Sequence, residues 1–101
     1  MNRGEVWWLE LPEGRRPVCV LTRQVAIDVL AAVVVAPATR TIRGIPTELP
    51  LTKGDGMPAD CVLTFDNLAT VPKTLLTKRI TTVPERRLPE LCSALRAATG
   101  C

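Results

Sequence analysis

The sequence predicts a mainly β domain closed by one C-terminal helix, a small twisted barrel or two-sheet fold of about six or seven strands. Short β-branched runs recur at close spacing and are separated by turn residues. After Pro84 the apolar residues change from an alternating to a helical period. The 101 residues suffice for one domain, residues 1–101, and its core must be aliphatic because aromatic residues make up only 3% of the chain.

The N-terminal part of the chain predicts two strands joined by a compact loop. Gly4–Leu11 alternates between apolar and polar residues. Trp7 and Trp8 must then point to opposite faces, so that one lies in the core and the other at a rim or partner surface. A loop containing proline and glycine leads to a second strand at Pro17–Thr22, and Arg23–Asp28 forms a polar connection or a short helical turn.

The uncharged run at Leu30–Ala38 predicts a third strand that is buried on both faces. Its ladder must stop or reach an edge at Pro37, because proline has no N–H to donate. Hydroxyl and guanidinium side chains follow at the rim of this strand: Thr39, Arg40, Thr41 and Arg43. Such a rim suits an anionic ligand, whereas the alternative is a strand that simply leaves the core into a solvated loop.

The remaining elements are short, up to the final helix. They are a turn at Arg43–Pro46, a strand at Thr47–Leu51, a loop at Thr52–Asp60, strands at Cys61–Phe65 and Ala69–Val71, a 3₁₀ turn at Pro72–Leu76 and a strand at Arg79–Val83. The helix has one apolar face, formed by Leu88, Leu91, Cys92, Leu95 and Ala98. Val83 stands where a capping Ser or Thr would lie, so the regular helix is expected to begin at Leu88 or Pro89 and to stop at Gly100.

The composition excludes several kinds of catalytic site. The chain has 13 basic and 10 acidic residues, a formal charge of +3, and no histidine or tyrosine, which excludes a His-based hydrolase or nuclease. The acidic residues are too scattered for a two-metal nuclease, and the four cysteines form no C-x-x-C pair. We therefore expect no metal and no cofactor. Cys19, Cys61 and Cys92 are expected to be buried thiols, and Cys101 to lie at a frayed end.

No membrane-spanning or secretory segment is predicted. The longest uncharged apolar run, Val29–Ala38, is too short to cross a bilayer. Arg3 and Glu5 stand where the apolar part of a signal peptide would lie. A cytoplasmic protein is therefore expected.

The basic and hydroxyl side chains that remain favour a reaction on a polyanion. Arg15 and Arg16 lie in the first loop, and adjacent antiparallel strands would bring them to the same rim as Thr39. Cleavage of RNA needs little else, because the 2′-OH of the substrate supplies the nucleophile. The protein then has to orient the phosphodiester, stabilise charge on its oxygens and assist proton transfer.

Several segments, taken in order, resemble the MazF/PemK-type toxins of bacterial toxin–antitoxin pairs. They are Arg3–Trp8, Arg16–Val18, Val35–Thr39, Asp66–Leu68, Thr70–Lys73, Leu76 with Ile80, and the closing helix from Glu85 to Arg96. The resemblance covers essentially the whole chain. It implies an SH3-like barrel of MazF/PemK/CcdB type and a homodimer. It also implies a metal-independent, sequence-specific endoribonuclease that cleaves single-stranded RNA into 2′,3′-cyclic phosphate and 5′-hydroxyl ends and so inhibits translation and growth.

The resemblance also implies the site residues. The catalytic arginine of the family, which precedes the proline that opens the second strand, falls on Arg16, and the catalytic threonine falls on Thr39. Substrate contacts are expected from Glu13, Arg15, Arg40, Thr41, Arg43, Asn67 and Lys73. The first loop is shorter than in many family members, and Glu13 is the only acid close to it. Its part in proton transfer therefore stays open.

The implied partners are an RNA substrate, whether messenger, transfer or ribosomal, and a cognate antitoxin with an acidic, partly disordered C-terminal segment. Operator DNA is expected only through the antitoxin. At the twofold interface of the dimer we expect one of the tryptophans, together with the C-terminal helix or the Asp66–Lys73 segment.

Two alternative functions stay open on the sequence alone. One is a non-catalytic toxin of the same fold that poisons a protein such as DNA gyrase. The fold relatives of that type present an aromatic residue at the end of the helix, whereas this chain ends Ala-Ala-Thr-Gly-Cys. The other is a degenerate toxin that is kept only as a co-repressor with its antitoxin.

Overall fold

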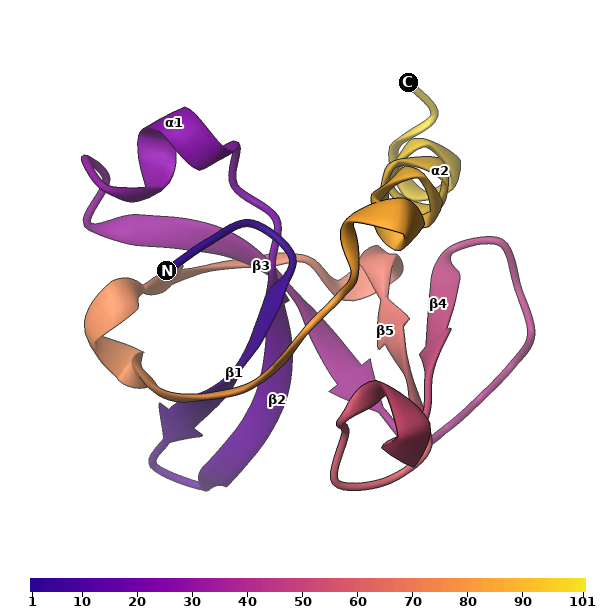
Figure 1. Cartoon of the computed structure of the whole chain (residues 1–101), viewed down its shortest axis with the longest axis horizontal. Helices are drawn as coiled ribbons and strands as arrows, with labels where there is room; N and C mark the ends of the chain where they lie inside the picture. Colours follow the sequence, from indigo (N-terminus) through magenta and orange to yellow (C-terminus); the bar gives the residue numbers. More distant parts are fainter.

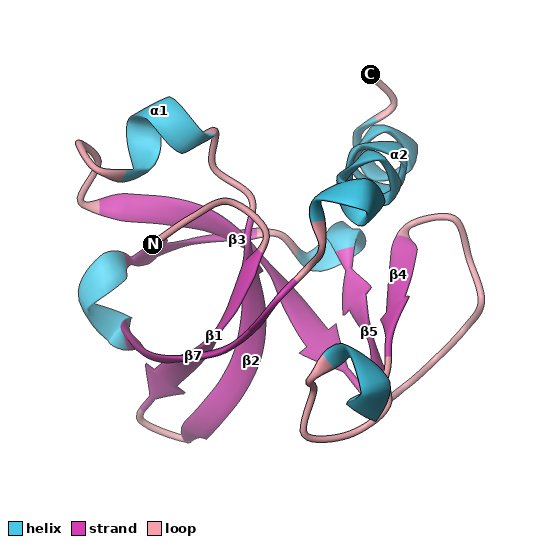
Figure 2. Cartoon of the chain, viewed as in Figure 1, coloured by secondary structure: helices cyan, strands magenta, loops and turns pink.

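Seven strands form one strongly curved sheet in the computed structural model, which describes residues 1–101 (Figure 1). The strand order is β4-β5-β3-β2-β1-β7, and β6 pairs with β3 outside this path. The strands are β1 (Glu5–Leu11), β2 (Gly14–Val20), β3 (Ala32–Thr39), β4 (Glu48–Leu51), β5 (Cys61–Thr64), β6 (Ala69–Pro72) and β7 (Leu76–Thr82). The helices are α1 (Gln24–Ile27) and α2 (Leu88–Thr99) (Figure 2). The predicted fold class, mainly β with a C-terminal helix, is confirmed.

β3 is the strand on which both halves of the molecule are built. Its first part lies between β2 and β6, and its last two residues, Ala38 and Thr39, pair instead with β5. The ladder between β2 and β3 does end at Pro37, as expected, although the strand itself continues. Pro37 lies opposite Val18 at the last rung that β3 shares with β2, and the strand then continues by changing its partner. A residue without an N–H is tolerated at such a change of partner.

β2 begins earlier than predicted, and this moves two arginines out of the expected loop. The β1–β2 hairpin is tight, with Leu11 opposite Gly14, so that only Pro12 and Glu13 form the turn. Arg15 and Arg16 consequently pair with β1 inside the sheet. Strand pairing sends these two neighbouring side chains to opposite faces of the sheet.

Two apolar clusters lie on opposite faces of the central strands, in place of the single modest core that the chain length suggests. Cys19 and Ala36 belong to the cluster under α2, and Val18 and Val35 belong to the cluster that also contains Ile27 of α1. This division follows from the pleat, which sends successive side chains to opposite faces. Figure 1 shows the same division, with α1 on one side of the molecule and α2 on the other.

The prediction that the third strand is buried on both faces is wrong at its beginning. Val34 is 37% exposed, and Leu30, just before the strand, is 42% exposed. Val25 and Val29 in and after α1 are more exposed still, at 83% and 79%. We call these four residues the apolar patch, because exposed aliphatic side chains of this size mark an interaction surface when they cluster.

Neither tryptophan lies in the core, contrary to the prediction for one of them. Both are half-buried. Trp7 packs against the cluster that contains Val18 and donates its indole N–H to Glu5 Oε1 at 3.0 Å. Burial by itself would raise the pKa of the Glu5 carboxyl, but hydrogen bonds from Asn2, Trp7 and Arg79 bring that pKa below its usual value. Trp8 lies on the opposite face, described below.

The C-terminal elements agree with the sequence analysis. α2 begins at Leu88 after a 3₁₀ turn at Glu85–Arg87, with proline in its first turn, and buries Leu91 and Ala94. Gly100 ends the helix at φ +73° and donates its N–H to the Arg96 carbonyl. The strand expected at Arg79–Val83 starts earlier, because the backbone from Leu76 onward already pairs with β1, and the preceding turn shrinks to Lys73–Leu75.

The four cysteines are free thiols. Cys19 and Cys61 are buried as predicted, whereas the prediction for Cys92 is wrong, because this thiol on α2 is only half-buried, and Cys101 is exposed. Burial raises the pKa of the Cys19 thiol to about 12, which keeps it protonated and unreactive. No helix in the structure has the length and apolar character needed to cross a membrane.

Candidate active site

Two hollows flank the point where β2 and β3 separate. The antiparallel register ends with Val18 opposite Pro37, and Arg16 and Thr39 lie two residues beyond this last rung, where both line the hollows. Because side chains alternate between the faces of a sheet, Arg15 and Arg40 belong to the other face. The strand ends thus present one arginine and one threonine on one side, and two arginines on the other.

The polar hollow is the smaller of the two, with a volume of about 180 Å³. Its lining residues are Arg16, Pro37, Ala38, Thr39, Thr41, Arg43, Glu48, Thr64 and Asn67. Guanidinium and hydroxyl groups in this combination match the oxygens of a phosphodiester, which accepts hydrogen bonds and carries negative charge.

Local hydrogen bonds hold the loop that forms the outer wall of the polar hollow. Glu48 Oε1 accepts the backbone N–H of Arg43 at 3.0 Å and that of Gly44 at 2.9 Å. The Thr41 N–H donates to Thr39 Oγ1 at 3.2 Å, and Thr47 Oγ1 donates to Asp66 at 2.6 Å. The carboxylate of Glu48 therefore positions the turn that carries Arg43, and its second oxygen, Oε2, makes no hydrogen bond within the protein.

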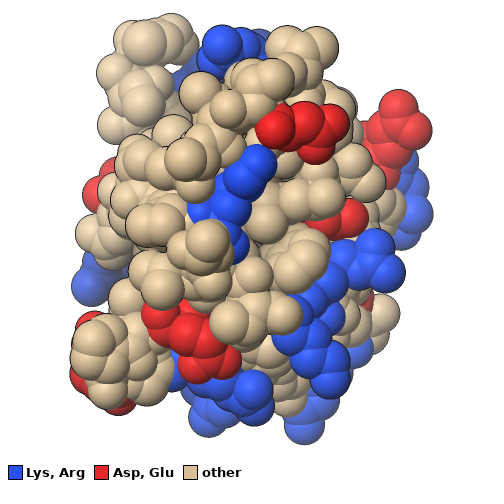
Figure 3. Space-filling view, turned by 90° about the vertical axis from the view of Figure 1, so that its left-hand side faces the viewer, with Lys and Arg blue, Asp and Glu red and all other residues tan.

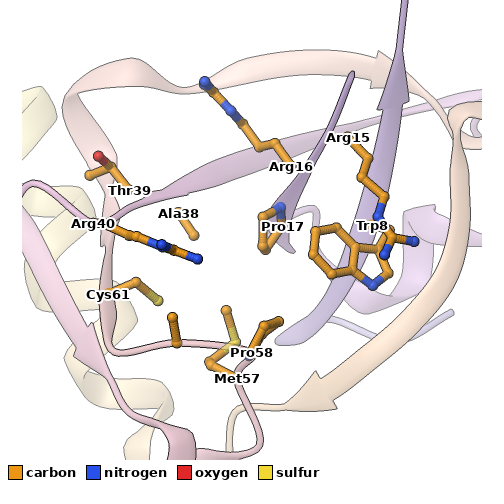
Figure 4. A pocket seen from close by; sticks show the side chains of 11 residues that line it. Trp8, Arg15, Arg16, Pro17, Ala38, Thr39, Arg40, Met57, Pro58 and Cys61 are labelled. Carbon is orange, nitrogen blue, oxygen red and sulfur yellow. The ribbon is translucent and has the colours of Figure 1, made fainter. Parts of the chain in front are cut away.

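The tryptophan hollow lies on the other face and has a volume of about 280 Å³ (Figure 4). Its lining residues are Trp8, Arg15, Arg16, Pro17, Ala38, Thr39, Arg40, Met57, Pro58, Ala59 and Cys61. The Arg15 guanidinium lies 4.2 Å from the centre of the Trp8 ring, in a cation–π contact. Figure 4 shows the Arg40 side chain directed into this hollow, whereas the Arg16 side chain and the Thr39 hydroxyl point away from it.

The wall opposite Trp8 comes from the loop between β4 and β5, and polar contacts fix that loop. Thr81 Oγ1 donates to the Asp55 carbonyl at 2.7 Å, and Arg87 lies 3.5 Å from the Asp55 carboxylate. Hydrogen bonds from the Thr52 backbone and hydroxyl, together with Arg87, hold the pKa of the Asp55 carboxyl below its usual value. Gly56 adopts φ +95°, and a Cβ there would lie 2.5 Å from Thr81 Oγ1.

The arginines of both hollows are available to an external anion. Arg15, Arg16, Arg40 and Arg43 form no ion pair, because the ion pairs of the chain involve only Arg79 and Arg87. On the face shown in Figure 3, the lysine and arginine side chains gather toward the lower end, where the β1–β2 hairpin lies in Figure 1. Unpaired cations at the end of a rigid sheet attract a polyanion and keep their charge free for it.

Most of the residues singled out in the sequence meet at this site. Arg15, Arg16, Thr39, Arg40, Thr41, Arg43 and Asn67 line one or both hollows. Glu13 lies in the exposed hairpin turn and lines neither hollow. Lys73 also lies outside both hollows: its Nζ donates to the Ile27 carbonyl at 2.6 Å and so connects the turn after β6 to α1.

Ten lining residues of the two hollows were not predicted as site residues: Trp8, Pro17, Pro37, Ala38, Glu48, Met57, Pro58, Ala59, Cys61 and Thr64. Trp8 was recognised only as a core or rim residue. Glu48 was counted among scattered acids, although its position two residues after Pro46 and within reach of the turn glycine was a usable signal. The Met57–Pro58 wall depends on a long-range approach of one loop to β1, and no local pattern reveals it.

Residues 2–99 match the model of a protein family described as PemK-like, MazF-like toxins of type II toxin–antitoxin systems. This chain belongs to that family. It is 50% identical to the probable endoribonuclease MazF2 of Mycobacterium tuberculosis, over 102 aligned residues that cover 100% of both chains. The predicted resemblance to MazF/PemK-type toxins is therefore confirmed.

Solved structures of MazF-type proteins share the fold. The M. tuberculosis toxin MazF-mt6 superimposes with a TM-score of 0.87 at 33% identity, covering 95% of this chain and 96% of the other. A mycobacterial endoribonuclease solved in complex with its cognate antitoxin gives a TM-score of 0.89 at 26% identity, covering 99% and 95%. The MazF-type barrel expected from the sequence is thus also the observed architecture.

Proposed function

We propose that this protein is the endoribonuclease toxin of a type II toxin–antitoxin module, and that residues 1–101 form one toxin domain that cleaves single-stranded RNA. The observation that carries the proposal is the joint position of Arg16 and Thr39 at two neighbouring strand ends, in a hollow whose arginines form no ion pair. The curated names of its relatives as endoribonucleases support the same activity.

The polar hollow suits attack by a 2′-OH on the adjacent phosphorus. The Arg16 guanidinium would bind two phosphate oxygens through its paired N–H groups, and the Thr39 hydroxyl would donate to an oxygen on which charge develops. As the O–P bond to the 5′ oxygen of the next nucleotide breaks, that oxygen takes a proton from water, and the products are a 2′,3′-cyclic phosphate and a 5′-hydroxyl. Thr41 and Arg43 hold the flanking phosphate in this scheme.

Glu48 is assigned the proton transfer that the arginines perform poorly, because their pKa values are so high. It is the only carboxylate that lines the polar hollow, and Oε2 is free of protein partners. This oxygen would accept the proton of the 2′-OH as the bond to phosphorus forms. Glu13, which the family resemblance suggested, lies outside both hollows.

The partners follow from charge and from exposed apolar surface. An acidic, partly disordered antitoxin segment would neutralise the unpaired arginines and block both hollows. The apolar patch of Val25, Val29, Leu30 and Val34 would form the twofold surface of a homodimer, beside β6. Sedimentation at micromolar concentration tests the dimer, which a monodisperse monomer would refute. The toxin would act in the cytoplasm, where its RNA substrate lies.

The decisive experiment is incubation of the purified protein with total RNA in excess EDTA, followed by mapping of the new ends. We expect cleavage that leaves 5′-hydroxyl ends at a limited set of sequences. A folded protein that binds its antitoxin and cuts no RNA would instead be the co-repressor described above. Inhibition of purified DNA gyrase without RNA cleavage would favour the non-catalytic toxin.

A further inference from the structure

We propose that the tryptophan hollow binds the base of a guanosine next to the cleaved bond, and that Arg40 selects this base by its hydrogen-bonding edge. The proposal rests on the proposed endoribonuclease function, and it deepens that function by naming the nucleotide that the site recognises. It assigns separate tasks to the two hollows, with phosphate chemistry in the polar hollow and base recognition in the tryptophan hollow.

The size and lining of the tryptophan hollow suit a single flat base. Its volume of about 280 Å³ lies just under the range of roughly 300–1,000 Å³ that is typical of small-molecule sites. Met57 and Cys61 are buried at 4% and 5% exposure and form an apolar lining with Ala38 and Pro58. An apolar slot open on one side receives a ring that is hydrophobic on both faces.

Trp8 supplies the stacking surface at the rim of this slot. The Arg15 guanidinium lies over the indole at 4.2 Å, which fixes the orientation of the ring before any ligand arrives. Aromatic side chains that are exposed beside arginines are the usual platforms for the bases of single-stranded nucleic acids. Stacking alone accepts every base, so a second group has to provide the selection.

Arg40 is that group, because its side chain is directed into the hollow and forms no ion pair (Figure 4). No carboxylate or amide side chain lines this hollow. The lining is therefore rich in donors, and it favours a base edge that consists of acceptors. Guanine presents O6 and N7 to an arginine fork, whereas the same edge of adenine presents N7 beside an amino group that can only donate.

The position of the hollow places this base close to the reaction. Arg16 and Thr39 contribute to the lining of both hollows, and the two hollows lie on opposite sides of the strand ends that carry these residues. A phosphodiester bound between Arg16 and Thr39 therefore has an adjacent nucleotide within reach of Trp8 and Arg40. The wall of the hollow at Met57 is held in place by the contacts of the neighbouring Asp55 with Thr81 and Arg87. A wall that does not move helps the hollow to discriminate between bases of different shape.

The first test maps all cleavage sites in total RNA for the unchanged protein, for Arg40→Gln and for Arg96→Gln. Arg96 is exposed on α2 and lines neither hollow, so its variant is the matched control. We expect guanine to dominate one position adjacent to the cut in the unchanged protein and in the control. In Arg40→Gln the preference at that position should move toward adenine by roughly ten- to hundredfold, because glutamine matches the N6–N7 edge of adenine.

The second test needs no variant and uses the unchanged protein on a short oligoribonucleotide that contains the mapped site. The guanosine is replaced by inosine, by 7-deazaguanosine or by adenosine. Inosine keeps O6 and N7 and should be cleaved like guanosine, whereas the loss of N7 in 7-deazaguanosine should slow cleavage about tenfold. Adenosine should be the poorest substrate. Equal cleavage of all four oligonucleotides would overturn the proposal even if Arg40→Gln failed to fold.

The outcomes separate this proposal from the function on which it rests. If the unchanged protein cuts no RNA, the proposed endoribonuclease function itself is refuted. If it cuts RNA with a cytosine, a uracil or no fixed base next to the cut, the function stands and the guanine site is refuted. The site is also refuted if Arg40→Gln keeps the base preference and instead loses only affinity for an acidic antitoxin peptide.

Discussion

The polar hollow and the tryptophan hollow share three lining residues, Arg16, Ala38 and Thr39, and one pair of strands, yet they differ in almost every other property. The polar hollow is lined mainly by hydroxyl, guanidinium and carboxylate groups, and loop hydrogen bonds around Glu48 shape it. The tryptophan hollow has a buried apolar lining, an indole at its rim and arginines as its only charged groups.

The difference between the hollows comes from the pleat of the sheet. Arg15 and Arg16 are neighbours in the chain, but the alternation of β2 sends them to opposite faces, and Arg40 is separated from Thr39 in the same way. A chain that lacks histidine and tyrosine thus builds two chemically distinct surfaces from one short run of residues on each of two strands. Substitutions that affect one hollow should leave the other intact, and this expectation can be tested.

The largest effect is expected in the polar hollow, from Arg16→Ala and Thr39→Ala. Each removes a group that contacts developing charge, and such a loss typically slows a reaction by about 10²–10³-fold. The check is single-turnover cleavage in EDTA, with circular dichroism to establish the fold. Residual cleavage by these variants should keep the base preference of the unchanged protein. Cleavage at the unchanged rate would remove that residue from the mechanism.

Glu48→Gln should produce the next largest effect, a fall in the cleavage rate of about 10²-fold. The glutamine carbonyl can still accept the N–H groups of Arg43 and Gly44, so the loop keeps its position while the proton acceptor is lost. Glu48→Ala is the comparison, because it removes the loop contacts as well. If Glu48→Gln retains full activity and only Glu48→Ala loses it, Glu48 positions the loop and takes no part in proton transfer.

Gly56→Ala should act on the tryptophan hollow through its wall. The backbone at φ +95° disfavours any side chain, and the new Cβ would lie 2.5 Å from Thr81 Oγ1. We expect a loss of about 2 kcal/mol in the free energy of unfolding, measured with urea, and a weaker base preference. The same substitution in a Thr81→Ala background should be less harmful, since the clash is relieved. Additive losses would show that the clash plays no part.

Lowering the pH should destabilise the β4–β5 loop, which forms this wall, because the Asp55 carboxylate becomes protonated. Its pKa in the folded protein lies below the ordinary value of 3.8, so its carboxylate stabilises the fold above that pH. This stabilisation is lost as the pH falls through the lower, folded value. We expect Asp55→Asn to reduce the free energy of unfolding by about 1 kcal/mol at pH 7, and we expect this difference to shrink as the pH falls below 3.8 and through the lower folded pKa. A difference that is constant between these pH values would contradict the assignment.

The smallest effect should come from Arg43→Gln. If Arg43 contacts a flanking phosphate, its removal weakens RNA binding only a few-fold, but it lowers the slope of log K against log salt by about 0.7. Arg96→Gln on α2 should leave this slope unchanged. Binding isotherms of an uncleavable oligonucleotide over a range of salt concentrations provide the measurement. An unchanged slope for Arg43→Gln would mean that its charge is simply solvated.

The sequence was informative wherever local chemistry decided the structure. Thr39 ends a run of β-branched residues, and Arg16 precedes a proline that opens an apolar strand, so their approach across an antiparallel pair could be predicted. The helix start after Glu85–Arg87 followed in the same way from the missing cap and from Pro89. These predictions depended on neighbours within a few residues.

The errors have a common physical cause, which is contact between distant segments. β3 continues past Pro37 with a new partner that no local pattern reveals, because β5 pairs with its last two residues where the pairing with β2 ends. Leu63 lies opposite Ala38 and Val62 opposite Thr39, which are 25 and 23 residues apart in the chain. Lys73 lies far from the site, because its ammonium group donates a hydrogen bond to the Ile27 carbonyl. The wall at Met57 could not be foreseen, because it depends on how the β4–β5 loop folds back toward β1.

The change of partner along β3 also determines how the molecule comes apart. Alternate residues of this one strand, such as Val35 and Ala36, belong to different apolar clusters. If either cluster unfolds, about half of the buried side chains of β3 lose their packing partners. The strand that carries Thr39 is then no longer held in the sheet. The two halves should therefore unfold in a single cooperative transition rather than one after the other. A partly melted form that keeps the rest of the fold but lacks the site is therefore not expected, and loss of the site by unfolding means loss of the whole domain.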